Sequence, residues 1–238
     1  MPNHETIYAE HAAEYDLLIS KQPKLGEVIA SIRPWEGLDV VDLGAGTGRL
    51  SAMLAAKARS LVALDASPAM LEVLKSRVAQ ELSSGPNASG LKNWRTELSG
   101  HLRLPLPDSS ADLIVSGWSL CYSCGAQVPD WENNLAQAMT ELERALRPGG
   151  TVILFENMGS GSETPAPPDF LLPYFALLEE RYGFSRRIIR TDYRFDSVEE
   201  AEVLTAFFFG RWLAERVRAN NWSVVPECAG VWWRTRPV

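Results

Sequence analysis

The chain has 238 residues, 46% of them hydrophobic and 22% charged, and these proportions are ordinary for a globular protein that buries one sizeable core. The formal net charge of −7 and the lack of a continuous lysine and arginine stripe argue against nucleic acid as the main partner. No apolar run approaches the roughly 20 residues that span a bilayer, and the N-terminus has no basic region followed by an apolar stretch. We therefore expect a cytoplasmic protein, monomeric or homodimeric, that engages neither nucleic acid nor membrane.

The three cysteines are too few and too unevenly spaced for a disulfide framework. Cys121 and Cys124 form one Cys-x-x-Cys pair, but a zinc site would need two further ligands, and only Cys228 and three scattered histidines remain. We expect no metal site.

The first two thirds of the chain alternate between helical and strand-like apolar patterns. In chain order we expect helices at 5–20 and 24–33, a strand at 38–43, a helix at 47–57, a strand at 60–65, a helix from Pro68, strands at 92–98 and 111–116, a helix capped by Asp130 and stopped by Pro148-Gly149-Gly150, and a strand at 151–156. Strands that alternate with helices favour a parallel sheet with right-handed crossovers and helices on both faces.

The pattern changes after residue 157. A loop or lid rich in glycine, serine and proline is expected at 159–168, then a helix at 169–182, an extended strand at 185–195, a long helix from the capping box Ser197-x-x-Glu200 to about Ala219, and a strand at 230–236 paired antiparallel with 185–195. The predicted fold class is α/β, a doubly wound and mostly parallel seven-stranded sheet with a C-terminal antiparallel hairpin. We expect a single domain divided into a helical cover (1–34), a core (35–157), a lid (158–184) and a C-terminal part (185–238).

The segment Asp-Leu-Gly-Ala-Gly-Thr-Gly at 42–48 lies between the first strand and its helix, at the sheet edge where ligands bind open α/β folds. Its glycines permit a close approach of backbone to ligand. Dinucleotide sites also have glycine turns, but here Arg49 stands where their third glycine would be. Asp42 would repel a pyrophosphate and suits a cationic amino acid, and Asp65, which ends the second strand, can accept both hydroxyls of a ribose.

At these residues the chain resembles the class I S-adenosylmethionine-dependent methyltransferases, in particular the small-molecule branch called methyltransferase type 11. The resemblance covers about residues 8–157 and rests on four blocks, at 42–48, 64–70, 104–115 and 146–151. It implies the Rossmann-like fold, S-adenosylmethionine as cofactor, and methyl transfer to oxygen, nitrogen or carbon of a small molecule.

The resemblance also implies which residues hold the cofactor. It places Gly44–Gly48 around the methionine part, Asp65 on the ribose, Ala66 and Met70 against the adenine, and Tyr8 and Tyr15 in a partial cover. Family members often carry an aspartate just ahead of the Leu-Pro block to hold the adenine amino group, whereas this chain has Leu98-Ser99-Gly100-His101-Leu102 there. The full expected set is Tyr15, Asp42, Gly44, Ala45, Gly46, Thr47, Gly48, Asp65, Ala66, Met70, Ser99, Gly100, His101 and Trp118.

Methyl transfer from a sulfonium is an in-line displacement of an activated group, so alignment and exclusion of water do most of the work. The sequence contains no visible acid/base triad, and the catalytic candidates are His101, Tyr122 and Glu156. Trp118, Tyr122, Asn157 and Tyr193 are the candidates for acceptor contact, since aromatic faces can also stabilise a sulfonium.

Two other functions remain open. A non-catalytic cofactor-binding or regulatory module would explain the missing adenine aspartate, and an NAD-dependent oxidoreductase would share the fold.

Overall fold

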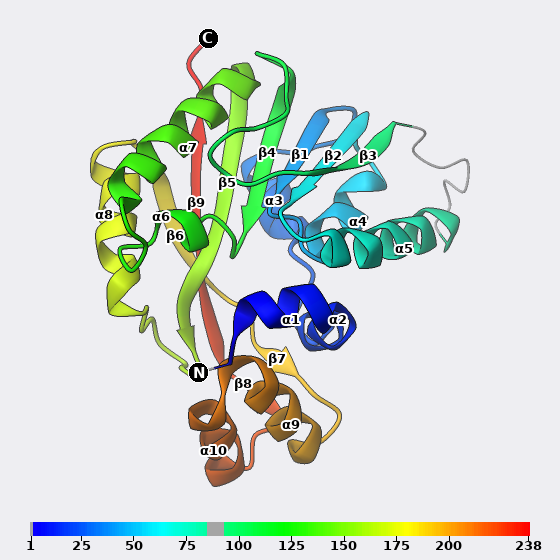
Figure 1. The fold of residues 1–238 in the computed structure, drawn as a ribbon, viewed down its shortest axis with the longest axis vertical. Coiled ribbons are helices and arrows are strands. Elements are labelled where there is room, and N and C mark those ends of the chain that lie inside the picture. The colour runs from blue at the N-terminus through cyan, green and yellow to red at the C-terminus, as the bar shows by residue number, and fades with distance from the viewer. Residues whose placement is uncertain (1, 85–92) are drawn as a thin grey trace.

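The computed structural model describes residues 2–84 and 93–238, and its centre is a seven-stranded sheet with the strand order β3-β2-β1-β4-β5-β9-β6 (Figure 1). The strands are β1 Asp39–Leu43, β2 Ser60–Asp65, β3 Trp94–Leu98, β4 Ala111–Gly117, β5 Leu146–Ser160, β6 Ser185–Arg190 and β9 Glu227–Thr235. The first five run parallel, and β9 is antiparallel to both β5 and β6. The predicted fold class is therefore confirmed.

Helices surround this sheet, and a second sheet pairs two short strands. The helices are α1 His4–Glu10, α2 Ala12–Ser20, α3 Gly26–Ile32, α4 Arg49–Ala55, α5 Pro68–Ser84, α6 Cys121–Cys124, α7 Trp131–Ala145, α8 Leu172–Glu180 after the 3-10 turn η1 Asp169–Leu171, α9 Val198–Phe209 and α10 Arg211–Asn220. The two short strands are β7 Tyr193–Arg194 and β8 Val224–Val225. Within residues 2–84 and 93–238, no helix is both long and apolar enough to cross a membrane.

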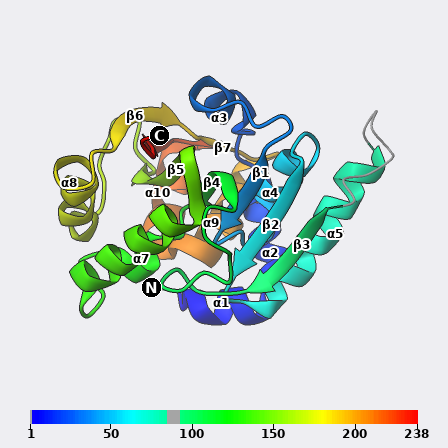
Figure 2. The ribbon, with the colours of Figure 1, turned by 90° about the horizontal axis from the view of Figure 1, so that it is seen from above.

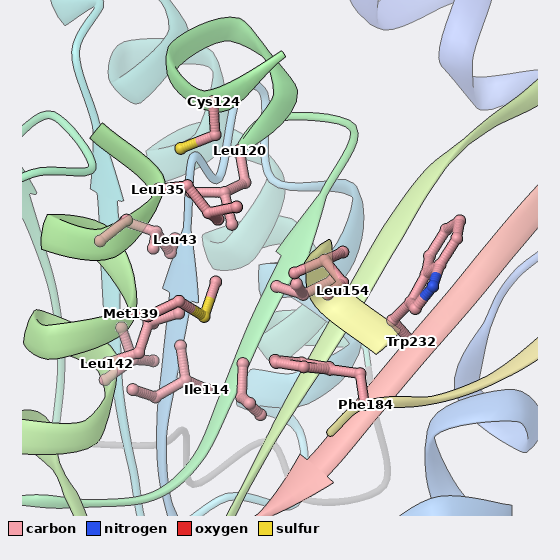
Figure 3. Packing of buried hydrophobic residues seen from close by; sticks show 14 of the residues in the cluster. Leu43, Ile114, Leu120, Cys124, Leu135, Met139, Leu142, Leu154, Phe184 and Trp232 are labelled. Carbon is pink, nitrogen blue, oxygen red and sulfur yellow. The ribbon is translucent and has the colours of Figure 1, made fainter. Parts of the chain in front are cut away.

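Helices cover both faces of the sheet, so both faces are buried. Successive side chains of each strand point to opposite faces and therefore enter different cores. Val41, Leu43 and Ile114 pack with α7 and α8 on one face (Figure 3). Val40 and Leu113 pack with α3, α4 and α5 on the other, and the two helical layers are seen on either side of the sheet in Figure 2. This explains why the core strands read as continuous apolar runs.

A third cluster joins the two ends of the chain. Leu18 of α2 packs with Tyr193, with Leu204 of α9 and with Leu213 of α10. The N-terminal helices and the C-terminal part therefore form one structure below the carboxyl edge of the main sheet (Figure 1).

Two of the helix predictions are wrong, because the structure has two shorter helices in place of each predicted one. The helix expected at 5–20 is interrupted at His11, whose φ of −126° is not helical. The helix expected from 197 to 219 breaks at Gly210, which has φ 88° and ψ −179°. Ser197 does cap α9, since its hydroxyl accepts a hydrogen bond from the Glu200 backbone N–H.

Other boundaries also differ. The strand expected at 185–195 ends at Arg190, and Tyr193–Arg194 pairs instead with β8. The strand expected at 151–156 extends over Leu146–Ser160, so it includes the glycines predicted to stop the preceding helix. Asp130 precedes α7 in a left-handed conformation (φ 59°) and makes no capping hydrogen bond. The strand expected at 92–98 begins at Trp94, and residue 92 lies outside the described residues.

Leu113 offers a test of the core. It is fully buried in β4 between β1 and β5, so Leu113→Ala should lower the free energy of unfolding by about 2–5 kcal/mol through lost burial and a residual cavity. The matched control is Leu172→Ala, since Leu172 is 50% exposed and its truncation should change stability little. Chemical denaturation of both variants measures the difference, and equal losses would contradict this packing.

Candidate functional site

The glycine loop after β1 requires its glycines for two reasons. Gly44, Gly46 and Gly48 have φ values of 68°, 53° and 87°, which side-chain-bearing residues rarely adopt. A Cβ on Gly44 would lie 1.6 Å from the Ser119 hydroxyl oxygen, and one on Gly48 would lie 2.8 Å from Leu74 Cγ. A Cβ on Gly46 would meet nothing within 4 Å, so the loop is open on that side.

Asp65 at the end of β2 fixes the loop. Its Oδ2 accepts a hydrogen bond from the Gly46 backbone N–H at 2.8 Å, and its Oδ1 accepts one from Ser67 at 2.8 Å. Burial raises the pKa of this carboxyl, and both backbone donors act in the opposite direction. Each carboxylate oxygen has a second lone pair, so these bonds leave acceptor capacity for a ligand hydroxyl.

A cavity of about 440 Å³ opens beside this loop, and we call it the central cavity. Ten predicted site residues line it: Tyr15, Asp42, Gly44, Ala45, Gly46, Thr47, Trp118, Tyr122, Asn157 and Tyr193. They come from α2, β1 with its loop, the ends of β4 and β5, α6 and β7. The fold therefore brings together, around one cavity, predicted residues that are up to 178 positions apart in the sequence.

The remaining predicted residues lie outside the lining of the central cavity. They are Gly48, Asp65, Ala66, Met70, Ser99, Gly100, His101 and Glu156. Ala66 is exposed, whereas Met70 is buried in α5. The Ser99 hydroxyl donates to the backbone carbonyls of Gly100 and Arg103, and the Ser99 N–H donates to the Asp65 carbonyl, so this segment is held beside the end of β2.

His101 has a hydroxyl partner on each ring nitrogen. Nδ1 lies 2.8 Å from Ser123 Oγ and Nε2 lies 2.6 Å from Ser119 Oγ. Burial lowers the pKa of His101 to about 4, so the imidazole is neutral at pH 7. This arrangement links the loop after β3 to the loop after β4, and a role for His101 as catalytic base stays a prediction.

Glu156 lies outside the lining of the central cavity but bonds to Cys121, which belongs to it. Its Oε1 accepts hydrogen bonds from the Tyr174 hydroxyl and from the Cys121 N–H, both at 3.1 Å. Burial raises the pKa of Glu156 to about 7, and these two donors offset part of that effect. Glu156 is positioned to orient α6, which begins at Cys121, and its catalytic role also stays a prediction.

Asp42 and Thr47 are polar residues of the lining of the central cavity. Asp42 Oδ2 accepts a hydrogen bond from Ser51 Oγ at 2.6 Å. Within the described part of the chain, Asp42 Oδ1 and Thr47 Oγ1 are buried without a hydrogen-bond partner. Burial raises the pKa of Asp42 to about 7, with a smaller contribution from Asp65. A cation beside Asp42 would favour its ionised form.

Aromatic side chains from both chain ends close the other side of the cavity. The Tyr8 and Tyr122 hydroxyls lie 2.7 Å apart, and Tyr122 Oη lies 3.3 Å from His4 Nδ1. His4 stacks on Phe208 with a centroid distance of 4.4 Å, and its Nε2 lies 3.0 Å from the Phe208 carbonyl oxygen. Burial raises the pKa of Tyr8 and Tyr122, so both act as hydroxyls and not as phenolates.

Five polar residues of the lining were not predicted from the sequence: His4, Gln22, Arg49, Gln127 and Glu227. Gln22 and Glu227 carry no motif, and only the fold brings them to the cavity. Arg49 had a signal, because it directly follows the last glycine of the loop at the first position of α4. Its guanidinium carbon lies 4.5 Å from the centre of the Trp118 ring.

Comparisons with known proteins agree with this geometry. Residues 41–154 match the family model described as a methyltransferase domain. A malonyl-[acyl-carrier protein] O-methyltransferase from Serratia marcescens is 33% identical over 161 residues, which are 66% of this chain and 53% of that protein. The chain thus spans about half the length of the curated relatives it matches.

Solved structures share the fold. The YcgJ protein from Bacillus subtilis has a TM-score of 0.57 at 17% identity, with 90% of this chain and 98% of that chain covered. A SAM-dependent methyltransferase from Aquifex aeolicus has a TM-score of 0.51 at 20% identity, with 87% of each chain covered. These structures share the fold, and the family-model match over residues 41–154, which hold the glycine loop and the acidic end of β2, identifies this part of the chain as a methyltransferase domain of the class I S-adenosylmethionine-dependent type.

Proposed function

We propose that this protein transfers the methyl group of S-adenosylmethionine to a small acceptor enclosed in the central cavity. The observation that supports this most is the cavity itself, since one continuous space is lined both by the glycine loop and by the aromatic wall formed by α1, α6 and α9. A donor over the loop and an acceptor against the wall would face each other in that space.

The residues present fit this cofactor. The open side of Gly46 and the unpartnered Oδ1 of Asp42 suit the methionine part, whose ammonium can donate to a buried carboxylate. Asp65 is the proposed ribose acceptor beside the loop. Gly100 also has open space around its Cα, so backbone can approach the adenine edge in place of an aspartate. Ala66, Met70, Ser99 and His101 stay proposed neighbours of the adenine.

The bound cofactor supplies an activated methyl group, so the protein's own residues must align the reactants and exclude water. Trp118 lines the cavity, stacks on Phe155 at a centroid distance of 5.9 Å, and has the Arg49 guanidinium carbon 4.5 Å from its ring centre. We expect this ring to form one wall of the reaction space beside the sulfonium. The hydrogen bonds among Tyr8, Tyr122 and His4 connect α1 to α6, and the stacking of His4 on Phe208 connects α1 to α9. We expect these contacts to restrict the access of water once the reactants are bound.

The lining favours a planar or partly apolar acceptor. Its rings include Tyr8, Trp118, Tyr122, Phe170 and Phe208. Asn157 and Tyr193 are the proposed polar contacts to such a molecule. The relative from Serratia is named for a carrier-protein-bound acceptor, but 53% of its length aligns, so the reacting atom of the acceptor here stays open among oxygen, nitrogen and carbon. We further propose the division into cover, core, lid and C-terminal part given above.

A substitution at Gly44 tests whether the glycine loop binds the cofactor. Gly44→Ala should weaken binding of S-adenosylhomocysteine by at least about a hundredfold, because the Cβ would displace Ser119 and the linked His101. Gly37→Ala is the matched control: it has a similar φ of 71° but meets nothing within 4 Å, so it should cost about 1–2 kcal/mol of stability and leave binding unchanged. Calorimetric titration measures both, and the double variant Gly44→Ala/Ser119→Gly should recover part of the lost affinity.

Asp65 tests the ribose contact. Asp65→Ala should weaken binding of S-adenosylhomocysteine about a hundredfold, since two charge-assisted hydrogen bonds and the Gly46 anchor are removed. Asp108→Ala is the control, because the Asp108 carboxylate is 77% exposed and pairs only at the surface with Arg144. Unchanged affinity in a folded Asp65→Ala variant would contradict the ribose role.

A methyl-transfer assay with a substitution at Tyr122 tests whether the protein is catalytic. Aromatic acids, phenols and amines are incubated with S-adenosylmethionine labelled in the methyl group, and labelled product is counted. Tyr122→Phe should lower kcat/KM about tenfold by breaking the connection to Tyr8 and His4. Tyr182→Phe should be neutral, because its buried hydroxyl has no partner among the described residues. Binding of S-adenosylhomocysteine without turnover of any acceptor would favour the non-catalytic module instead.

A further inference from the structure

Three polar residues form one connected network in the wall of the central cavity. The Arg49 guanidinium donates to Gln22 Oε1, and Gln22 Nε2 donates to Glu227 Oε2 at 3.2 Å. All three line the cavity, and they come from three separate segments: the start of α4, the loop after α2, and β9.

Several contacts hold the network in place. The Glu227 backbone is anchored, because Glu227 N donates to Asp192 Oδ1 at 3.0 Å and the Glu227 carbonyl accepts from Thr191 N at 2.9 Å. The Arg49 side chain is held by the Pro23 carbonyl at 3.2 Å and by stacking on Trp118. The Glu227 carboxyl is held by its hydrogen bond from Gln22.

Packing alone does not account for the network. Glu227 is 2% exposed, and burial raises its pKa to about 8, with Arg49 as the largest opposing influence. Burial likewise lowers the pKa of Arg49. Placing opposite charges in an apolar wall costs free energy, and a buried ionisable pair in a cleft points to a ligand.

We propose that Arg49 and Glu227 hold the amino-acid end of the cofactor, with Arg49 on its carboxylate and Glu227 on its ammonium. A pKa of about 8 leaves the Glu227 carboxyl largely protonated at pH 7 in the free protein, and the ammonium of a bound zwitterion would favour its ionised form. Ionised Glu227 and Arg49 in one wall are complementary to that zwitterion, and Asp42 in the same lining offers the ammonium a second acceptor. Gln22 bonds to both side chains and so positions them. This inference rests on the proposed function and extends the cofactor site into β9, outside residues 41–154.

Two ligands separate the amino-acid end from the nucleoside. S-adenosylhomocysteine carries the aminocarboxylate, whereas 5′-methylthioadenosine has the same nucleoside and thioether without it. Calorimetry with the purified protein should show that Arg49→Met and Glu227→Gln each weaken S-adenosylhomocysteine about ten- to a hundredfold and change methylthioadenosine less than about threefold. Arg49→Lys should lose less than Arg49→Met, because it keeps the charge without the bidentate geometry.

Arg211→Met is the matched control, since Arg211 is exposed and lies outside the cavity lining, and it should leave both affinities unchanged. Thermal melts identify variants that fail to fold, and Glu227→Gln, which keeps the shape of the side chain, then carries the test. Equal losses for both ligands, or no loss for either, would overturn the assignment of Arg49 and Glu227 while leaving the proposed function intact. Failure of the unaltered protein to bind S-adenosylhomocysteine would overturn both.

Discussion

The hydrogen bonds between the Asp65 carboxylate and the backbone of Gly46 and Ser67 are the constraint on which the site depends. They connect the loop after β1 to the end of β2, and a further bond from Ala45 N to the Leu64 carbonyl reinforces that connection. The loop can follow this path only with glycines, because three of its residues have positive φ and Gly44 packs directly against Ser119. A single carboxylate thus organises the loop and still has lone pairs for a ligand.

The fold of the core could be predicted because its signals are local. The apolar runs of β1, β2 and β4 alternate between the two helical layers, and Ser67-Pro68 marks the start of α5. The breaks at His11 and Gly210 could not be predicted with the same ease. Gly210 lies within a strongly helical pattern, and α9 and α10 fold back on each other because each packs an apolar side into the cluster around Leu18.

The site likewise has a part that could be predicted from the sequence and a part that could not. The glycine loop, Asp42 and Trp118 have fixed places relative to β1 and β4, so their arrangement follows once the parallel sheet is recognised. Gln22 and Glu227 are 205 positions apart and have no motif, and they meet only because β9 pairs with β5 and the N-terminal helices pack on the C-terminal part. Polar partners contributed by the far end of a chain are invisible to reasoning that proceeds from local spacing.

The contrast between site residues inside and outside the segment 41–154 bears on how specificity for an acceptor could change. The segment shared with the methyltransferase domain ends at residue 154, and it contains the loop, Asp65 and Trp118. The aromatic wall and the charged network take His4, Gln22, Phe208 and Glu227 from outside that segment. Lys21 pairs with Glu200 at 2.7 Å, so the cover and the C-terminal part are held together independently of the core. Substitutions in the aromatic wall can therefore reshape the proposed acceptor side of the cavity while the geometry of the glycine loop, fixed by Asp65, is preserved.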